Sequence, residues 1–197
     1  MAGRPREFDR DAALEAAMFL FWRKGYEAAS MHDLCNAMGV SSPSLYAAFE
    51  SKEALYLAAI EHYVQTQGPP VWDKLADGKT ARDGVESLLL GAAEVLPKSR
   101  TAPAGCMALL GGVSDEWPAT IARAIRNVRL DMLGNLRARI EGAVASGELP
   151  AATDVGSLSR FYLSVFQGMA IQAKDGATPA ELQGVVKAAM ATWPGKG

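Results

Sequence analysis

Apolar residues recur three and four positions apart along almost the whole chain, and this helical period constrains the fold more than any other feature of the sequence. Near the N-terminus, Leu14, Met18 and Phe21 fall on one such stripe. The alternation of β-branched and polar residues that a half-buried strand requires is missing from the sequence. We therefore predict an all-α fold.

Capping residues and glycines divide this pattern into about nine helices. A Ser, Thr or Asp side chain stands at most of the predicted starts, where its oxygen can accept a hydrogen bond from first-turn N–H groups. The predicted helices cover residues 9–25, 30–38, 41–49, 51–67, 80–96, 106–113, 118–146, 154–174 and 178–193. The Gly68-Pro69-Pro70 sequence is the strongest break between them and therefore a candidate domain boundary.

Composition favours a globular protein and argues against several functional classes. The 197 residues are 49% hydrophobic and 21% charged, which is ordinary for a folded domain. The two cysteines, Cys35 and Cys106, form neither a disulfide framework nor a zinc-ligand set, so no metal or other cofactor is expected. No secretory signal is recognisable, and the longest nearly uncharged apolar run, residues 161–173, is too short to cross a bilayer. We expect a cytoplasmic protein with no membrane partner.

Catalytic constellations are likewise missing from the sequence. The two histidines, His32 and His62, have no neighbouring cysteine or carboxylate in a nucleophile arrangement. Gly111 and Gly112 fall within a predicted helix and follow no strand, so they do not make a phosphate-binding loop. An enzyme is therefore not expected.

Two short predicted helices near the N-terminus are joined by a tight turn over residues 38–41. Gly39 stands in this turn, where the missing Cβ permits an unusual backbone conformation. This is helix-turn-helix spacing, and the segment resembles the DNA-binding domain of the TetR family of transcriptional regulators. The residues that carry the resemblance are Phe21, Gly25, Tyr26, Ser30, Leu34, Gly39, Val40, Ser41, Leu45, Tyr46, Phe49, Lys52 and Leu55.

The resemblance implies an architecture and a function. Residues 1–50 would form an N-terminal arm and a three-helix DNA-binding domain, and residues 51–197 a larger helical ligand-binding and dimerisation domain. It implies a homodimer held by helices 154–174 and 178–193, which represses from a palindromic double-stranded DNA operator and is released by a small-molecule inducer. The alternatives are an all-helical protein-interaction module and a small-molecule binder that does not bind DNA.

One face of the third predicted helix is expected to read the operator, because Leu45 and Phe49 would anchor its other face to the core. The residues expected to face the major groove are Ser42, Pro43, Ser44 and Ala47. None of them is Arg, Lys, Asn or Gln, so bidentate reading of guanine or adenine cannot come from this face. Specificity is therefore expected to depend on the arm, whose Arg4 and Arg6 resemble the core of minor-groove AT-hook peptides. The alternative for the arm is a disordered basic tail.

Phosphate contacts are expected around this face. The resemblance assigns them to Tyr46 and Lys52, which are both hydrogen-bond donors; a core aromatic and a solvated lysine are the alternatives. Ser30 and Ser41 begin helices, where backbone N–H groups favour an anion, and both are also expected to be caps. His32 is one turn into its helix and is either a further phosphate contact or an ordinary surface residue.

Apolar residues of the C-terminal part are candidates to line an inducer pocket, since such pockets are largely apolar. The candidates are Cys106, Met107, Leu110, Trp117, Phe161, Phe166 and Met169. Ordinary core packing is the alternative for each of them. Cys106 at a helix start is either a thiol sensor of oxidants or electrophiles, or a small packing residue.

The charge balance limits how such a protein can hold DNA. The formal net charge is −2. Residues 1–60 contain six Lys or Arg and eight Asp or Glu, so the predicted DNA-binding part is itself acidic. Its basic side chains gather near the arm and at Lys52. We therefore expect few phosphate contacts and a weak non-specific affinity for DNA.

Overall fold

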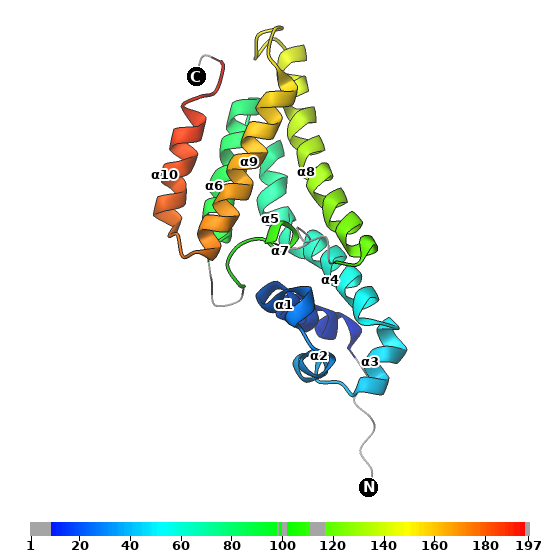
Figure 1. The fold of residues 1–197 in the computed structure, drawn as a ribbon. Coiled ribbons are helices and arrows are strands. Elements are labelled where there is room, and N and C mark those ends of the chain that lie inside the picture. The colour runs from blue at the N-terminus through cyan, green and yellow to red at the C-terminus, as the bar shows by residue number, and fades with distance from the viewer. Residues whose placement is uncertain (1–8, 98, 100–101, 111–116, 196–197) are drawn as a thin grey trace. The chain divides into compact units, whose positions relative to one another are not determined.

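The computed structural model describes residues 9–97, 99, 102–110 and 117–195, and every regular element in these ranges is helical (Figure 1). This confirms the predicted all-α fold. The chain divides into two compact units, residues 1–63 and 64–197. Within the described ranges, no helix is both long and apolar enough to span a bilayer.

The first unit is built from α1 (Arg10–Ala28), α2 (Met31–Met38), α3 (Ser42–Phe49) and most of α4 (Lys52–Gln67). The first three helices begin at predicted caps: Asp9, Ser30 and Ser41 each accept a hydrogen bond from a first-turn N–H group. Gly25, the predicted end of the first helix, has φ 78° and ψ 170°, which breaks the helical path inside α1. The helix then continues for three more residues, to Ala28.

Leucine and aromatic side chains form the core of this unit. Leu34, Leu45 and Leu55 are completely buried. The ring of Tyr56 meets the ring of Phe21 edge-on, with 4.8 Å between their centroids. Burial raises the pKa of the Tyr56 phenol well above its ordinary value, so this group stays neutral and behaves as part of the core.

The second unit contains the remaining helices. They are α5 (Pro69–Trp72), a 3-10 turn η1 (Asp73–Ala76), α6 (Ala81–Val95), α7 (Met107–Leu110), α8 (Ala119–Ala145), α9 (Val155–Lys174) and α10 (Pro179–Met190). The long helices α8 and α9 lie side by side and antiparallel, and α10 packs on α6 (Figure 1). The break predicted at Gly68-Pro69-Pro70 is confirmed, since α4 ends at Gln67. The two prolines then begin α5, because prolines fit the first turn of a helix.

The boundary between the compact units falls inside α4, at residues 63 and 64. The sequence-based boundary after residue 50 lies just before the start of the same helix. It divides the chain by expected function rather than by compactness, and it stays a prediction.

A carboxylate fixes the start of α6. Glu148, in the loop between α8 and α9, accepts hydrogen bonds from the N–H groups of Ala81 at 2.8 Å and Arg82 at 3.1 Å. Arg139 of α8 donates to the carbonyl oxygen of Thr80 at 2.8 Å. Because a helix start attracts negative charge, these contacts tie α6 to the α8–α9 pair.

Glu50, which ends α3, carries the positive-φ backbone of a non-glycine residue, with φ 62° and ψ −46°. Such a conformation strains an L side chain by about 1–3 kcal/mol. We therefore expect Glu50→Gly to stabilise the protein by about 1 kcal/mol, after allowing for the entropy cost of glycine. Chemical denaturation followed by circular dichroism measures the change.

The matched control is Glu61→Gly, because Glu61 is exposed in the helical interior of α4. Glycine there should destabilise the protein by about 1 kcal/mol. A loss of stability in Glu50→Gly equal to that of the control would contradict the strain at Glu50.

Candidate nucleic-acid interface

The turn between α2 and α3 has the backbone that its sequence predicts. Gly39 adopts φ 67° and ψ 29°, the left-handed conformation. Its N–H donates to the carbonyl of Asn36, and the N–H of Val40 donates to the carbonyl of Cys35 at 3.0 Å. These bonds end α2, and three residues, 39–41, lie between it and α3.

Helix α3 has one buried and one exposed face. Leu45 is completely buried and Phe49 is 4% exposed. The exposed residues of the helix are Ser42, Pro43, Ser44, Tyr46 and Ala47, with Tyr46 47% exposed. The structure therefore brings together every residue predicted to face a major groove, and it places Tyr46 outside the core. Contact of these residues with DNA stays a prediction.

Ser30 and Ser41 both act as helix caps. The Ser30 hydroxyl accepts from the N–H of Asp33 at 3.1 Å, and Ser41 accepts from the N–H of Ser44 at 3.3 Å. Both side chains are exposed, so the caps lie where an anion can approach the helix starts. His32 is also exposed and lies 3.2 Å from the side-chain nitrogen of Asn36. Asn36 is a polar group on this surface that sequence reasoning missed.

Lys52 is held against the end of α1. Its ammonium lies 4.4 Å from the ring centroid of Tyr26 and donates to the carbonyl of Glu27 at 3.3 Å. An ammonium has three donors, so this arrangement leaves capacity for a phosphate oxygen. The half-buried side chain is thus both a structural contact and a candidate phosphate ligand.

A second basic residue also binds inside the first unit. The Lys24 ammonium lies 2.9 Å from the carboxylate of Asp33. The pKa of Asp33 falls from 3.8 to about 2. The hydrogen bond from Lys24 makes the largest contribution, and the hydrogen bond from the Ser30 hydroxyl the next largest. This pair joins α1 to α2, and only the folded arrangement reveals it. Arg4 and Arg6, the predicted minor-groove residues, lie outside the described residues.

The candidate inducer-pocket residues of the second unit separate into buried and exposed groups. Cys106, Met107, Phe166 and Met169 are buried, with 3% or less of each exposed, and Trp117 is half-buried. The Phe166 ring meets Trp72 with 5.1 Å between centroids. The side chain of Leu110 lies outside the described residues.

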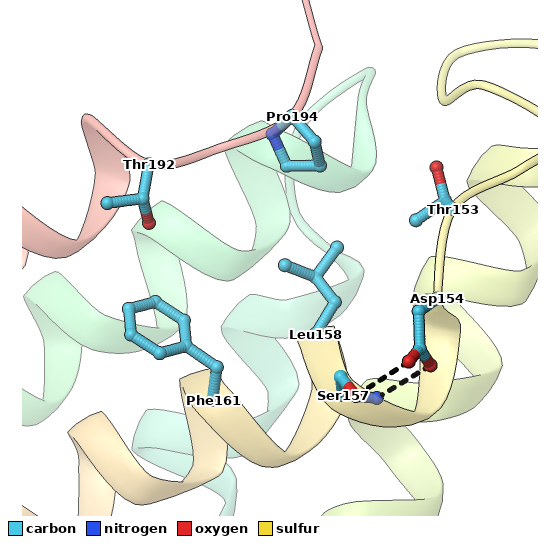
Figure 2. Close-up of a pocket in the computed structure, with 7 residues that line it drawn as sticks. All are labelled: Thr153, Asp154, Ser157, Leu158, Phe161, Thr192 and Pro194. Atoms are coloured by element: carbon cyan, nitrogen blue, oxygen red, sulfur yellow. Dashed lines mark hydrogen bonds between the residues drawn. The ribbon is translucent and has the colours of Figure 1, made fainter.

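Phe161 is not brought together with this buried group. It lies five positions before Phe166, which is about 140° around a helix, so the two rings leave opposite sides of α9. Phe161 is 40% exposed. It lines a surface hollow of about 430 Å³ with Leu158, Thr192 and others (Figure 2). Figure 2 also shows Ser157 donating from its N–H and hydroxyl to Asp154, which caps α9.

Within the described ranges, no group of three or more His, Cys, Asp or Glu side chains is placed to hold a metal ion. The chemistry that the first unit offers is instead a row of small polar and donor groups on an exposed helix. This arrangement suits contact with a nucleic acid.

Comparison with known proteins identifies the family. Residues 13–59 match the family model described as bacterial regulatory proteins, tetR family. The HTH-type transcriptional repressor ComR of Escherichia coli (strain K12) is 33% identical over 195 residues, which are 98% of this chain and 92% of that protein. The repressor BdcR of the same strain is 38% identical over 109 residues, about half of each chain.

A solved structure is similar over the same length. The TetR family transcriptional regulator CifR, a cysteine mutant complexed with 26bp double-strand operator DNA, is 39% identical with a TM-score of 0.90. The match covers 98% of this chain and 100% of that chain. These relatives are regulators and not enzymes, as the sequence predicts. The chain therefore belongs to the TetR family and is a helix-turn-helix transcriptional regulator.

Proposed function

We propose that the protein is a repressor that binds a palindromic operator as a homodimer and leaves it when a small apolar or thiol-reactive inducer binds. The observation that carries this proposal is the exposed face of α3, held by Leu45 and Phe49 in a chain similar to the operator-bound CifR structure. ComR and BdcR are named repressors, which favours repression over activation.

Operator contact would use residues that present different chemistry. Ser30, Ser41 and the backbone N–H groups at the starts of α2 and α3 bind phosphate. Tyr46, Lys52 and His32 make further phosphate contacts. Pro43 and Ala47 meet thymine methyl groups. Because this face carries no bidentate reader, Arg4 and Arg6 supply specificity by entering an adjacent narrow minor groove.

The exposed faces of α9 and α10 support the homodimer. Phe161 and Ile171 on α9 are 40% and 54% exposed, so two large apolar side chains of this helix are available to a second copy. Gly168 of α9 and Gly184 of α10 have open space where a Cβ would lie, so a second copy can approach closely there. A dimer through these helices sets the spacing of two recognition helices, which must be about 34–36 Å apart on DNA.

The buried group of the second unit supports an apolar inducer. Met107 begins α7, and Cys106 directly precedes it. This helix packs against both α8 and α9, and α9 carries Phe166 and Met169. A ligand that inserts among these side chains must change their packing. It would favour a conformer of the dimer whose two recognition helices no longer have the spacing that operator DNA requires. The thiol of Cys106 gives a thiol-reactive inducer a target within the same group.

Tyr46→Phe tests the DNA contact directly. Removing a hydrogen bond to a charged phosphate costs about 1.5–3 kcal/mol, so affinity for a fragment of the protein's own promoter should fall about tenfold or more. Fluorescence anisotropy with labelled DNA measures the dissociation constant.

Tyr63→Phe is the control, since it makes the same change in a ring that is buried against Trp22. It should leave the affinity for DNA unchanged. If Tyr46→Phe also binds as tightly as the natural protein, Tyr46 makes no phosphate contact and this part of the proposal is wrong.

Cys106→Ser distinguishes the two kinds of inducer. If an electrophile such as N-ethylmaleimide releases the protein from DNA through Cys106, release should be lost in Cys106→Ser and retained in Cys35→Ser, which alters the half-buried cysteine of α2. Mass spectrometry locates the adduct and anisotropy reports release. Unchanged release in Cys106→Ser would eliminate the thiol-reactive inducer and leave the apolar one.

A further inference from the structure

Residues 68–76 form a short, closely packed corner between α4 and α6, which we call the α5–η1 corner. It begins directly after the last residue of α4 and contains α5 and η1. At Gly68, a Cβ would overlap the carbonyl oxygen of Val64 in the last turn of α4. Val71 and Leu75 are 5% and 6% exposed, so both short helices of the corner are anchored in the core. A shift of the corner is therefore passed to the end of α4.

Helix α6 supports this corner at two glycines. Gly84 and Gly91 are both buried and lie seven positions apart, so they are on one side of the helix. A Cβ on Gly84 would overlap the carbonyl oxygen of Leu75, which belongs to the backbone of η1. A Cβ on Gly91 would lie 2.5 Å from Cδ of Lys74, near the end of a flexible side chain. The backbone of η1 thus rests directly on α6 at Gly84.

A buried arginine closes the other side of this support. Arg139 of α8 donates from Nη2 to the carbonyl oxygen of Thr80, the cap of α6, at 2.8 Å. Its buried Nε lies 3.2 Å from the position of a Cβ on Gly84. A side chain at position 84 would meet the guanidinium on one side and the η1 backbone on the other. It could be accommodated only if η1 moved away from α6 or the arginine lost its place.

The same corner contacts the buried group that we propose for the inducer. Trp72, the last residue of α5, meets the ring of Phe166 on α9 with 5.1 Å between centroids and 65° between ring planes. Trp72 directly precedes η1. Because a closely packed interior transmits strain, a ligand that displaces Phe166 also pushes on Trp72.

We propose that the α5–η1 corner carries inducer binding to α4. Phe166 pushes on Trp72, η1 leaves its support at Gly84, and the end of α4 shifts with the corner. The two positions of η1, on Gly84 or away from it, would then belong to the DNA-binding and released states. This inference rests on the proposed function, because it gives the route by which the proposed inducer lowers the affinity for the operator.

Gly84→Ala tests the support without any inducer. The added methyl group should displace η1 and weaken binding to a fragment of the protein's own promoter about tenfold or more, as measured by fluorescence anisotropy. Gly91→Ala is the matched control, because it makes the same change on the same side of α6 but meets only the movable Lys74 side chain. It should change the affinity by about twofold or less. The proposal is wrong if Gly84→Ala binds like the natural protein, or if both variants lose affinity alike.

An exchange of rings tests the contact with Phe166, and it decides the question if circular dichroism shows that Gly84→Ala is unfolded. Phe166→Trp enlarges the ring that meets Trp72 and should weaken promoter binding about tenfold. The double variant Phe166→Trp/Trp72→Phe restores the combined size of the two rings and should bind within about twofold of the natural protein.

Two results of the ring exchange would overturn the proposal while promoter binding by the natural protein is intact. One is an unchanged affinity in Phe166→Trp, and the other is a double variant that binds no better than Phe166→Trp. Failure of the natural protein to bind the fragment would instead overturn the proposed function, and this inference with it.

Discussion

The burial of Leu34 on α2 and Leu45 on α3 is the constraint on which the exposed face of α3, our proposed DNA-reading face, depends. Both side chains are completely excluded from solvent, and truncating such a leucine typically costs about 2–5 kcal/mol, much of the stability of a small domain. Because α3 turns through 100° per residue, fixing Leu45 inward also fixes Ser44 and Ala47 outward. Gly39 permits the sharp entry into this helix. The functional surface is therefore a direct consequence of the core.

The electrostatics of the first unit are local. Four basic residues occur between positions 9 and 63, and three of them have contacts within the fold. Lys24 pairs with Asp33, Lys52 lies over Tyr26, and Arg10 stacks on Phe49 with 4.8 Å from its guanidinium carbon to the ring centroid. These contacts stabilise the helices while reducing the charge that is displayed to a polyanion. The net acidic composition of this unit is consistent with a DNA reader that relies on hydrogen bonds from serines, tyrosine and helix starts.

Features set by neighbouring residues could be predicted from the sequence, whereas those set by long-range packing could not. The caps at Ser30 and Ser41 and the two faces of α3 follow from patterns within a few residues. The Glu148 cap of α6 joins groups more than sixty residues apart. Phe161 shows the same limit, because an apolar residue on a long helix can face either the core or a partner. The family resemblance contributed most to the prediction of the first 55 residues, where the residues that carry it lie.

The salt dependence of operator affinity tests the central claim most directly, because it counts the phosphate contacts of an acidic DNA reader. With Arg4, Arg6 and Lys52 as cationic contacts in each subunit, a dimer should show a slope of log affinity against log salt of about −5 or shallower. A promoter fragment whose sequence has been scrambled should bind much more weakly than the natural fragment at every salt concentration. A slope near −10, or equal affinity for the scrambled fragment, would contradict the account.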